Sequence, residues 1–514
     1  MSDKREKQKR TELWEEQYFK LQNGSDIRGV AIAGPDERVT LTPAVVQNIA
    51  SAFVDYISEK KDIIRENIRI GVGNDSRLSA KSLKQGVISG VIHRGAEVFD
   101  CGLASTPAMF MSTVLEEFKL DGAIMITASH LPYNRNGLKF FTENGGLDKE
   151  EISEILRRAI LLSRMERRVE CFSVRQVPLM DVYSAYLKTI IRRETGEKDS
   201  PYPLQGLHIV IDASNGVSGY FARLLEEMGV STEGSIFLEP DGNFPNHVPN
   251  PENKEAMDAI RTAVLESGAD LGIIFDTDGD RAAVVFSDGE EVNKNTIIAL
   301  MAAILADSYP HTTVVTDSVT SDHLTEFLEQ KLQMHHHRFK RGYKNVINEA
   351  MRLNREGIES HLAIETSGHG ALKENYFLDD GAYMAVKIIC RLALYKRQGR
   401  KLQEMTTGLK KSEESREYRI KIIDEDYQSY GIQVLKEFER FVGKLKGFQV
   451  VKENYEGVRV RFCNEDVKGW MLLRMSLHDP LMPLNIETEQ KGGTEKILKK
   501  IRPFFAQFSQ LGTI

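Results

Sequence analysis

Apolar positions along the chain follow two alternating patterns. Over about the first 400 residues, short apolar runs typical of buried strands alternate with segments whose apolar residues recur at helical spacing. Residues 42–57 are one example, with apolar side chains from Val45 to Ile57 at helical spacing and Pro43 well placed in a first turn. A strand pattern follows at residues 68–72. This alternation predicts βαβ units and largely parallel sheets.

Three stretches share a more specific pattern, in which a short buried-strand motif runs directly into a polar loop containing glycine or serine. They are residues 121–130, 270–280 and 361–369. In open α/β sheets, ligands bind beyond the carboxyl ends of the strands. We therefore expect an α/β protein with three similar domains of mixed, mostly parallel sheets, each contributing one loop to a shared central cleft.

Shifts in composition suggest the domain boundaries. The polar, proline-bearing stretch 192–204 predicts a linker, and a turn near residue 288 and the charged stretch 397–415 predict two further breaks. Beyond the last break, two helical patterns flank strand patterns at residues 448–451, 458–463 and 470–475. This arrangement indicates a separate C-terminal α+β domain. The predicted domains are residues 1–195, 196–290, 291–410 and 411–514.

The composition is that of a globular protein. A chain of 514 residues is too long for one hydrophobic core, and 41% hydrophobic with 28% charged residues excludes disordered and collagen-like classes. A net charge of −7 gives no reason to expect a nucleic-acid partner. The four cysteines lie far apart, without zinc-ligand or redox spacing, which suits a reducing compartment.

The chain has no pattern that predicts membrane contact or secretion. Its charged beginning lacks the apolar region of a signal peptide, and the longest apolar run, residues 297–306, is about half the length that spans a bilayer. We expect a soluble cytoplasmic protein, monomeric or dimeric. Residues 5–20 carry apolar side chains at helical spacing and predict an additional helix on the first domain.

The segment from Asp276 to Arg281 contains three carboxylates within five residues. Their mutual repulsion is costly unless a cation compensates it. Alternate residues of an extended segment point the same way, and Gly279 permits the bend that brings Asp276, Asp278 and Asp280 together. Mg²⁺ is typically held by a few carboxylates and leaves positions open for a phosphate oxygen. The segment therefore predicts a magnesium site.

Ser129 follows the first of the three strand motifs. A serine hydroxyl is a weak nucleophile until a base or a metal activates it, and this context is not the nucleophile elbow of hydrolases. Asparagines and Lys139 lie just downstream and could bind oxyanions, which suits phosphoryl transfer better than acyl transfer. From this segment alone, Ser129 is either a nucleophile or the cap of a helix.

The two segments and the loops around them resemble the α-D-phosphohexomutase superfamily, which includes phosphoglucomutases and phosphomannomutases. Segments similar to those of the family follow one another in the expected order along nearly the whole chain. They are residues 23–29, 75–77, 127–139, 241–246, 276–281, 365–369 and 469–476.

The resemblance implies an enzyme that interconverts hexose 1-phosphates and hexose 6-phosphates of glucose or mannose. In this reading, Ser129 carries the phosphoryl group and contacts the Mg²⁺ ion, the sugar passes through a bisphosphorylated intermediate, and a hexose bisphosphate is the activator. Besides Ser129, the residues implied for catalysis are Arg28, His130 and Lys139, and Arg28 or Lys139 would handle the hydroxyl proton. The residues implied for substrate binding are Arg281, Lys344, Glu365, Ser367, His369, Arg474, Ser476 and His478.

The segment similar to the phosphate-binding loop departs from the family pattern. Leu477 stands where the family has glycine, which restricts the backbone where amides would approach a phosphate. His478 replaces a neutral hydroxyl with a titratable ring, which could bind phosphate when protonated or indicate a different substrate. The loop at residues 341–344 is only roughly similar to its counterpart, and Leu131 replaces a usual asparagine.

Two other functions remain open on the sequence. A haloacid-dehalogenase-like phosphotransferase would use Asp276 as its nucleophile, but Asp280 stands where threonine or valine is expected. A sugar-phosphate-binding relative without turnover would fit the altered loop. It would not need Ser129, Lys139 and the three carboxylates together.

The triplet His335–His337 suggests a metal site, but adjacent side chains diverge and nothing acidic accompanies them in the segment. We interpret it as a basic loop facing an anionic substrate, or as a solvated edge.

Overall fold

The computed structural model describes residues 15–164, 174–464, 467–476 and 479–514. The chain forms two compact units. Of the described residues, unit 1 contains those up to Asn293 together with Ser367–Glu404, and unit 2 contains those of Lys294–Thr366 and Met405–Ile514.

The first sheet of unit 1 is mixed, as expected. Its strands, in spatial order, are β1 (Gln22–Asn23), β2 (Asp26–Val30), β6 (Arg135–Thr142), β5 (Gly122–Ile126), β3 (Arg69–Asn74), β4 (Glu97–Leu103) and β8 (Val174–Gln176), with β7 (Gly145–Gly146) beside β6. Strands β3, β4 and β5 are parallel, whereas β6 runs antiparallel to both β5 and β2. The carboxyl end of β5 therefore leads into the segment that contains Ser129.

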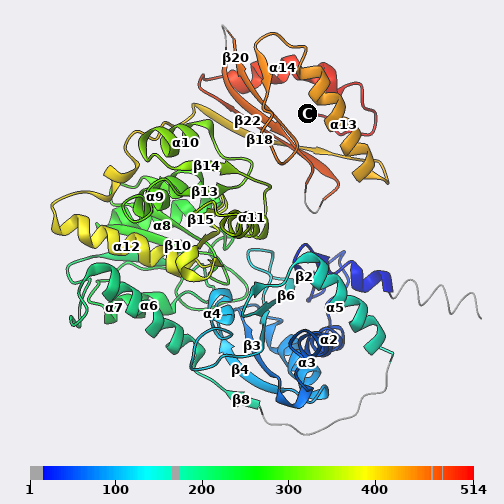
Figure 1. Cartoon of the computed structure of the whole chain (residues 1–514), viewed down its shortest axis with the longest axis vertical. Coiled ribbons are helices and arrows are strands. Elements are labelled where there is room, and N and C mark those ends of the chain that lie inside the picture. Colours follow the sequence, from blue (N-terminus) through cyan, green and yellow to red (C-terminus); the bar gives the residue numbers. More distant parts are fainter. Residues whose placement is uncertain (1–14, 165–173, 465–466, 477–478) are drawn as a thin grey trace, which may run out of the picture. The chain divides into compact units, whose positions relative to one another are not determined.

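Helices α2 (Pro43–Lys61), α3 (Ala80–His93) and α5 (Lys149–Leu162) lie together beside this sheet (Figure 1). Their apolar side chains form one core with the strands, in which the rings of Phe53 and Phe140 are 4.9 Å apart between centroids. Helix α2 begins after Thr42, whose side chain accepts a hydrogen bond from the Val45 amide. It runs four residues beyond the predicted end at residue 57.

The predicted N-terminal helix is described only in part. Residues 15–19 are helical, and the buried Tyr18 accepts a hydrogen bond of 2.8 Å from Asn48 of α2. Residues 5–14 of this prediction lie outside the described residues.

The second sheet of unit 1 contains β9 (Ile209–Asp212), β10 (Leu271–Phe275), β11 (Ala282–Phe286) and β12 (Glu291–Val292). Strands β9 and β10 are parallel, and β11 turns back antiparallel to β10. The other elements of unit 1 are α4 (Thr106–Met111), α6 (Leu179–Thr195), α7 (Tyr220–Glu227), α8 (Lys254–Ser267), β16 (Gly370–Leu372), β17 (Leu378–Asp379) and α12 (Gly381–Arg397).

The linker predicted at residues 192–204 begins later in the structure, after residue 195, so the predicted start is wrong. Arg192–Thr195 form the last turn of α6, where Ile191 and Thr195 are buried, and Gly196 ends the helix in the left-handed conformation. Polar residues in the last turn of an amphipathic helix look like a linker in sequence.

Unit 2 contains a parallel sheet with the strand order β14 (His335–Arg338), β13 (Thr313–Thr316) and β15 (Ser360–Ile364). Its helices are α9 (Lys294–Ala306), α10 (Asp322–Glu326), which continues into the π-helix Phe327–Lys331, and α11 (Tyr343–Arg355). The longest apolar run of the chain, residues 297–306, lies in α9, and this helix is buried from Thr296 to Leu305. Among the described residues, no helix is long and apolar enough to cross a bilayer.

The histidine triplet lies in strand β14 rather than in a loop. His336 accepts or donates hydrogen bonds at 2.8 Å with Thr316 and with Thr325, while His337 lies 2.8 Å from a carboxylate oxygen of Glu349. The interpretation as a basic loop is therefore wrong, because pairing with β13 orders the segment and α11 supplies a glutamate. The alternative of a solvated edge fits better, since β14 is the outermost strand of its sheet and His335 is exposed. The side chains do diverge, as the strand requires.

The C-terminal part of unit 2 is an α+β domain, as predicted. Its antiparallel sheet has the order β18 (Glu414–Lys421), β22 (Leu481–Thr488), β21 (Lys468–Leu473), β20 (Val458–Cys463) and β19 (Phe448–Val450). Helices α13 (Tyr427–Val442) and α14 (Gly493–Phe505) lie on one side of this sheet (Figure 1) and complete its core.

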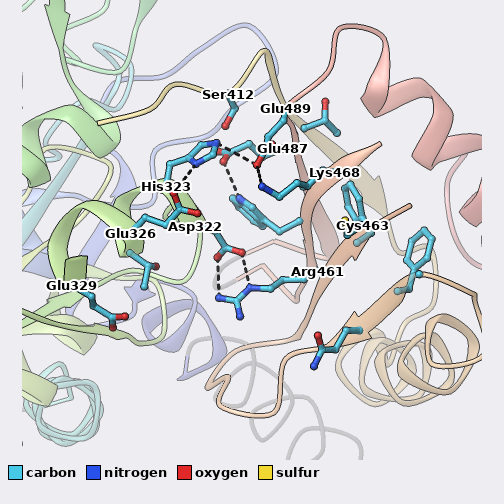
Figure 2. A pocket seen from close by; sticks show the side chains of 18 of the residues that line it. Asp322, His323, Glu326, Glu329, Ser412, Arg461, Cys463, Lys468, Glu487 and Glu489 are labelled. Atoms are coloured by element: carbon cyan, nitrogen blue, oxygen red, sulfur yellow. Dashed lines mark hydrogen bonds and ion pairs between the residues drawn. The ribbon is translucent and has the colours of Figure 1, made fainter. Parts of the chain in front are cut away.

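A cluster of ion pairs connects the two parts of unit 2. The Asp322 carboxylate, at the start of α10, accepts hydrogen bonds from Arg338 at 2.9 Å, from Arg459 at 3.0 Å and from Arg461 at 2.6 Å. Arg459 also lies over the ring of Trp470, 3.8 Å from its centroid. Asp322, Arg461 and Trp470 line a cavity of about 530 Å³, where Figure 2 shows the paired carboxylate and guanidinium.

Candidate active site

The acidic loop leaves the carboxyl end of β10 and folds back into β11. Gly279 takes a left-handed φ of 74°, so the bend predicted at this position is present. The three carboxylates are almost completely buried, with exposures of 0%, 0% and 1% for Asp276, Asp278 and Asp280. They offer oxygens that all lie within 4.8 Å of one another.

The carboxylates of this loop are close enough to affect one another's ionisation, and hydrogen bonds do not satisfy all of their oxygens. Burial and the neighbouring Asp280 carboxylate hold the pKa of Asp276 well above its ordinary value. Burial also opposes ionisation of Asp278, but Lys139 and a hydrogen bond from Thr106 outweigh it and lower the pKa of Asp278. Among the residues that the structure describes, one oxygen each of Asp278 and Asp280 is buried without a hydrogen-bond partner. Buried oxygens of this kind are ready ligands for a hard divalent cation, so the residues present fit a metal ion.

Ser129 lies directly beside the acidic loop. Its hydroxyl donates a hydrogen bond of 2.9 Å to Asp276, and Arg281 donates one of 3.1 Å to the same hydroxyl oxygen. Ser129 has a left-handed φ of 48°, which is unusual for a residue other than glycine. No helix follows before β6 begins at Arg135, so the helix-cap alternative is wrong.

Arg77 fixes the backbone around Ser129, and it was not among the predicted site residues. The guanidinium is buried and donates hydrogen bonds to the carbonyls of Ser129, Leu131, Pro132 and Arg135. It lies 3.2 Å from the buried Asp75. The Asp-x-Arg spacing of residues 75–77 was the sequence signal for it, but the four carbonyls it binds lie more than fifty residues further along the chain.

Lys139 and Arg28 bring positive charge to the same place from neighbouring strands. Lys139, on β6, is buried and pairs with Asp280 and, at 3.2 Å, with Asp278. Arg28, on β2, donates to the carbonyl of Thr127 and, at 2.8 Å, to Asp26. The structure thus places both predicted cations around the serine loop.

His130 is adjacent to Ser129 in space as well as in sequence, with its Nδ1 3.4 Å from the serine oxygen. Burial, reinforced by the charge of Arg281, lowers the pKa of His130 to about 2. The ring is therefore neutral at physiological pH and has no proton to give as an imidazolium.

Ser367 and His369 join this site from the segment after residue 366. Arg281 and His369 form an antiparallel β-bridge, and His369 Nδ1 is 2.9 Å from the Ser367 hydroxyl. His369 Nε2 faces carboxylate oxygens of Asp280 at 3.8 Å and of Asp379 at 3.5 Å. Asp379 was not predicted as a site residue, and only folding of β17 brings it here.

The remaining predicted residues belong to unit 2. Glu365, which is buried, accepts a hydrogen bond of 2.6 Å from the Gly342 amide, and Lys344 lies in the first turn of the adjoining helix α11. Arg474 is buried just beyond β21, and the amide of Ser476 bonds the Leu481 carbonyl. His478 and Leu477 lie outside the described residues.

Comparisons with known proteins agree along the chain. Models described as phosphoglucomutase/phosphomannomutase, alpha/beta/alpha domains I, II and III, match residues 20–163, 182–289 and 293–412. A phosphomannomutase/phosphoglucomutase of Pseudomonas syringae pv. tomato is 30% identical, over 84% of this chain and 88% of the relative. A phosphoglucomutase of Neisseria gonorrhoeae is 28% identical, over 93% and 95%. The crystal structure of a phosphoglucomutase/phosphomannomutase family protein from Burkholderia thailandensis has a TM-score of 0.75 at 25% identity and covers 96% of this chain and 97% of its own.

The fold, the acidic triad and these matches together define a metal-dependent mutase of the intramolecular phosphotransferase class. More particularly, the chain belongs to the phosphoglucomutase/phosphomannomutase family of the α-D-phosphohexomutase superfamily. The resemblance predicted from the sequence is confirmed. The haloacid-dehalogenase-like alternative is wrong, because models of a different family match residues 20–163, 182–289 and 293–412, including the acidic loop.

Proposed function

We propose that this protein interconverts the 1-phosphates and 6-phosphates of glucose, mannose or both, with Ser129 as the phosphoryl carrier. The observation that carries the proposal is the position of the Ser129 hydroxyl, between Asp276 of the acidic triad at 2.9 Å and Arg281 at 3.1 Å. A serine used only for structure has no need of a buried metal-type carboxylate and a buried guanidinium on one oxygen. Family membership supports the same reading.

Asp276, Asp278 and Asp280 would hold Mg²⁺, together with an oxygen of phosphorylated Ser129. The ion, when bound, would neutralise charge on the phosphoryl oxygens. Lys139 already balances two of the three carboxylates, which keeps the net charge of the loop low enough for an anionic substrate to approach.

In the first half-reaction, the oxygen of a sugar hydroxyl forms a bond to phosphorus as the bond to Ser129 Oγ breaks. The hydroxyl proton leaves to a basic group, for which we propose Arg28 or Lys139, acting by giving up one proton to the departing Ser129 Oγ and taking up the proton of the hydroxyl. Arg281 donates to Ser129 Oγ and would stabilise the negative charge that develops there. The second half-reaction returns the other phosphate of the bisphosphorylated sugar to Ser129, and a hexose bisphosphate would prime the enzyme.

We propose that Glu365 and Ser367 bind sugar hydroxyls and that Lys344, His369, Arg474, Ser476 and His478 assist in binding the substrate. Glu365 is already oriented by the Gly342 amide. A planar guanidinium such as that of Arg474 matches the oxygens of a phosphate. Glucose and mannose phosphates differ by the orientation of one hydroxyl, so a single hydrogen bond can decide between them.

The experiment is a turnover assay with the 1-phosphates of glucose, mannose and glucosamine, each primed with its matching bisphosphate and Mg²⁺. Ser129→Ala should lose turnover, whereas Ser89→Ala, at an exposed serine of the same sheet domain, should retain it. Full activity of Ser129→Ala would refute the mechanism. Absence of turnover with every hexose phosphate would favour the binding relative without catalysis.

A further inference from the structure

The guanidinium of Arg474 is buried with unmet hydrogen-bonding capacity. Its exposed fraction is 5%, its Nη1 donates only at 3.2 Å to the carbonyl of the adjacent Met475, and its Nε has no hydrogen-bond partner among the described residues. A buried charged donor without a partner is costly. This position is therefore built to receive an anion.

Two carboxylates whose charges act on Arg474, Glu456 and Asp317, each have one oxygen bonded to other donors. Glu456 accepts hydrogen bonds from the Ser318 hydroxyl and, at 3.2 Å, from the Arg341 amide. Asp317 accepts from the amide and hydroxyl of Thr366, at 3.3 and 2.6 Å. One oxygen of Asp317 is buried without a hydrogen-bond partner among the described residues, but neither carboxylate forms an ion pair with Arg474 there. The Arg474 guanidinium is therefore left to pair with an anionic ligand.

Arg341 is connected to Arg474 through Glu456 and Gly457. The backbone at Gly457 packs against Arg474, where an added Cβ would come within 2.8 Å of the Arg474 Cα, and the adjoining Glu456 holds the Arg341 amide. The Arg341 guanidinium is 25% exposed and reaches to 4.0 Å from Glu417. Burial lowers the pKa of Arg474, Glu456 opposes this, and the positive charge of Arg341 lowers it further, so the two guanidiniums act on each other.

We infer that Arg341 is a second guanidinium of the subsite of unit 2 that binds the phosphate monoester of the substrate, beside Arg474. The inference rests on the proposed function and extends it to a residue outside the predicted set. Two like charges held together repel, and a dianion between them removes that repulsion. The carboxylates of Asp317, Glu417 and Glu456 carry negative charge that repels a dianionic ligand, so the positive charge of one guanidinium is insufficient to bind it. Arg341 supplies the second one.

The test compares Arg341→Gln with Arg341→Lys, Arg474→Gln and wild type. The matched control is Arg419→Gln, because Arg419 contacts the same Glu417 at 3.5 Å but is 63% exposed. Steady-state kinetics should give Arg341→Gln a KM raised by about tenfold or more with kcat little changed, and Arg341→Lys an intermediate KM. Calorimetric titration with glucose 6-phosphate and with glucose, which lacks the phosphate, should show the affinity loss only for the phosphate ester. Arg419→Gln should behave as wild type.

The inference is overturned if Arg341→Gln retains the KM and the affinity of wild type, or if Arg419→Gln loses as much, since the effect would then come from releasing Glu417. It is also overturned if wild type binds neither glucose 6-phosphate nor mannose 6-phosphate. Wild-type binding without turnover would instead refute the proposed mutase activity, and the affinities of the variants would still decide the role of Arg341.

Discussion

At the scale of residues, the site depends on buried charges that hold one another in place. The Ser129 hydroxyl has one acceptor and one guanidinium donor, and the loop that carries it is fixed by Arg77 rather than by residues near it in sequence. The three aspartates follow one another so closely that the sequence sufficed to predict them. Arg77 and Asp379 could not be assigned in the same way, because their partners are distant in the chain.

Arg77→Lys tests the importance of the serine loop's position. Lysine keeps the positive charge beside Asp75 but cannot reach four carbonyls with one ammonium group. We expect kcat to fall by about 100-fold through misplacement of Ser129, with unchanged circular dichroism. Arg157→Gln, at an exposed arginine of the same domain, is the control. A kcat equal to that of wild type would show that the loop holds its position without the guanidinium.

Metal binding can be measured without turnover. Because a ligand that binds only the folded state stabilises it, Mg²⁺ at a hundredfold excess over its Kd should add about 2.7 kcal/mol to the free energy of unfolding. In Asp278→Asn this stabilisation should be lost, and EDTA should remove it from wild type. Equal stabilisation of wild type and Asp278→Asn, followed by thermal unfolding, would contradict the assignment of the acidic loop as the metal site.

At the scale of elements, the strands that end in polar loops were predictable because apolar runs are local. Strands β5, β10 and β15 all match the predicted pattern and are almost fully buried. The end of α6 and the pairing of His335–His337 were mispredicted. In both cases a packed neighbour, and not the local sequence, determines the structure.

The pair His247–Asp212 stabilises the loop region after β9 in a pH-dependent way. Burial opposes protonation of His247, but the hydrogen bond and charge of Asp212, 2.9 Å away, outweigh it and raise the pKa of His247 above 6.5. The stabilisation is therefore full below about pH 6.5 and is lost as the pH rises through the folded-state pKa.

Urea unfolding at a series of pH values checks this prediction. The difference in free energy of unfolding between wild type and His247→Gln should shrink as the pH increases above 6.5. A difference that is constant, or that grows with pH, would contradict a protonated His247.

The ion-pair cluster at Asp322 holds the C-terminal domain to the parallel sheet within unit 2. Asp322→Asn would leave Arg338, Arg459 and Arg461 without their common counter-charge. Asp322 is only partly buried, so we expect a cost of roughly 1.5–3 kcal/mol, typical of a hydrogen bond to a charged group. We expect faster amide exchange in α10 and β20, while α2 and β3 of unit 1 provide the internal reference. Unchanged exchange in α10 and β20 would show that apolar contacts suffice there.

At the scale of the whole molecule, the order of the family's motifs predicted the fold class and the enzyme class, because each motif is a short run of consecutive residues. The boundaries of the four domains, the cytoplasmic location and the monomeric or dimeric state remain predictions. The position of Arg341 relative to Arg474 was not predictable, since it depends on packing between the loop before α11 and the C-terminal sheet.

The central claim is that Ser129 carries the phosphoryl group. The most direct measurement is peptide-resolved mass spectrometry of the protein after incubation with glucose 1,6-bisphosphate and Mg²⁺ and quenching in acid. We predict a single acid-stable phosphoryl group on Ser129, which disappears when excess glucose 1-phosphate or 6-phosphate is present without bisphosphate, and which Ser129→Ala does not acquire. A phosphoryl group on another residue, with Ser129 unmodified, would contradict the account.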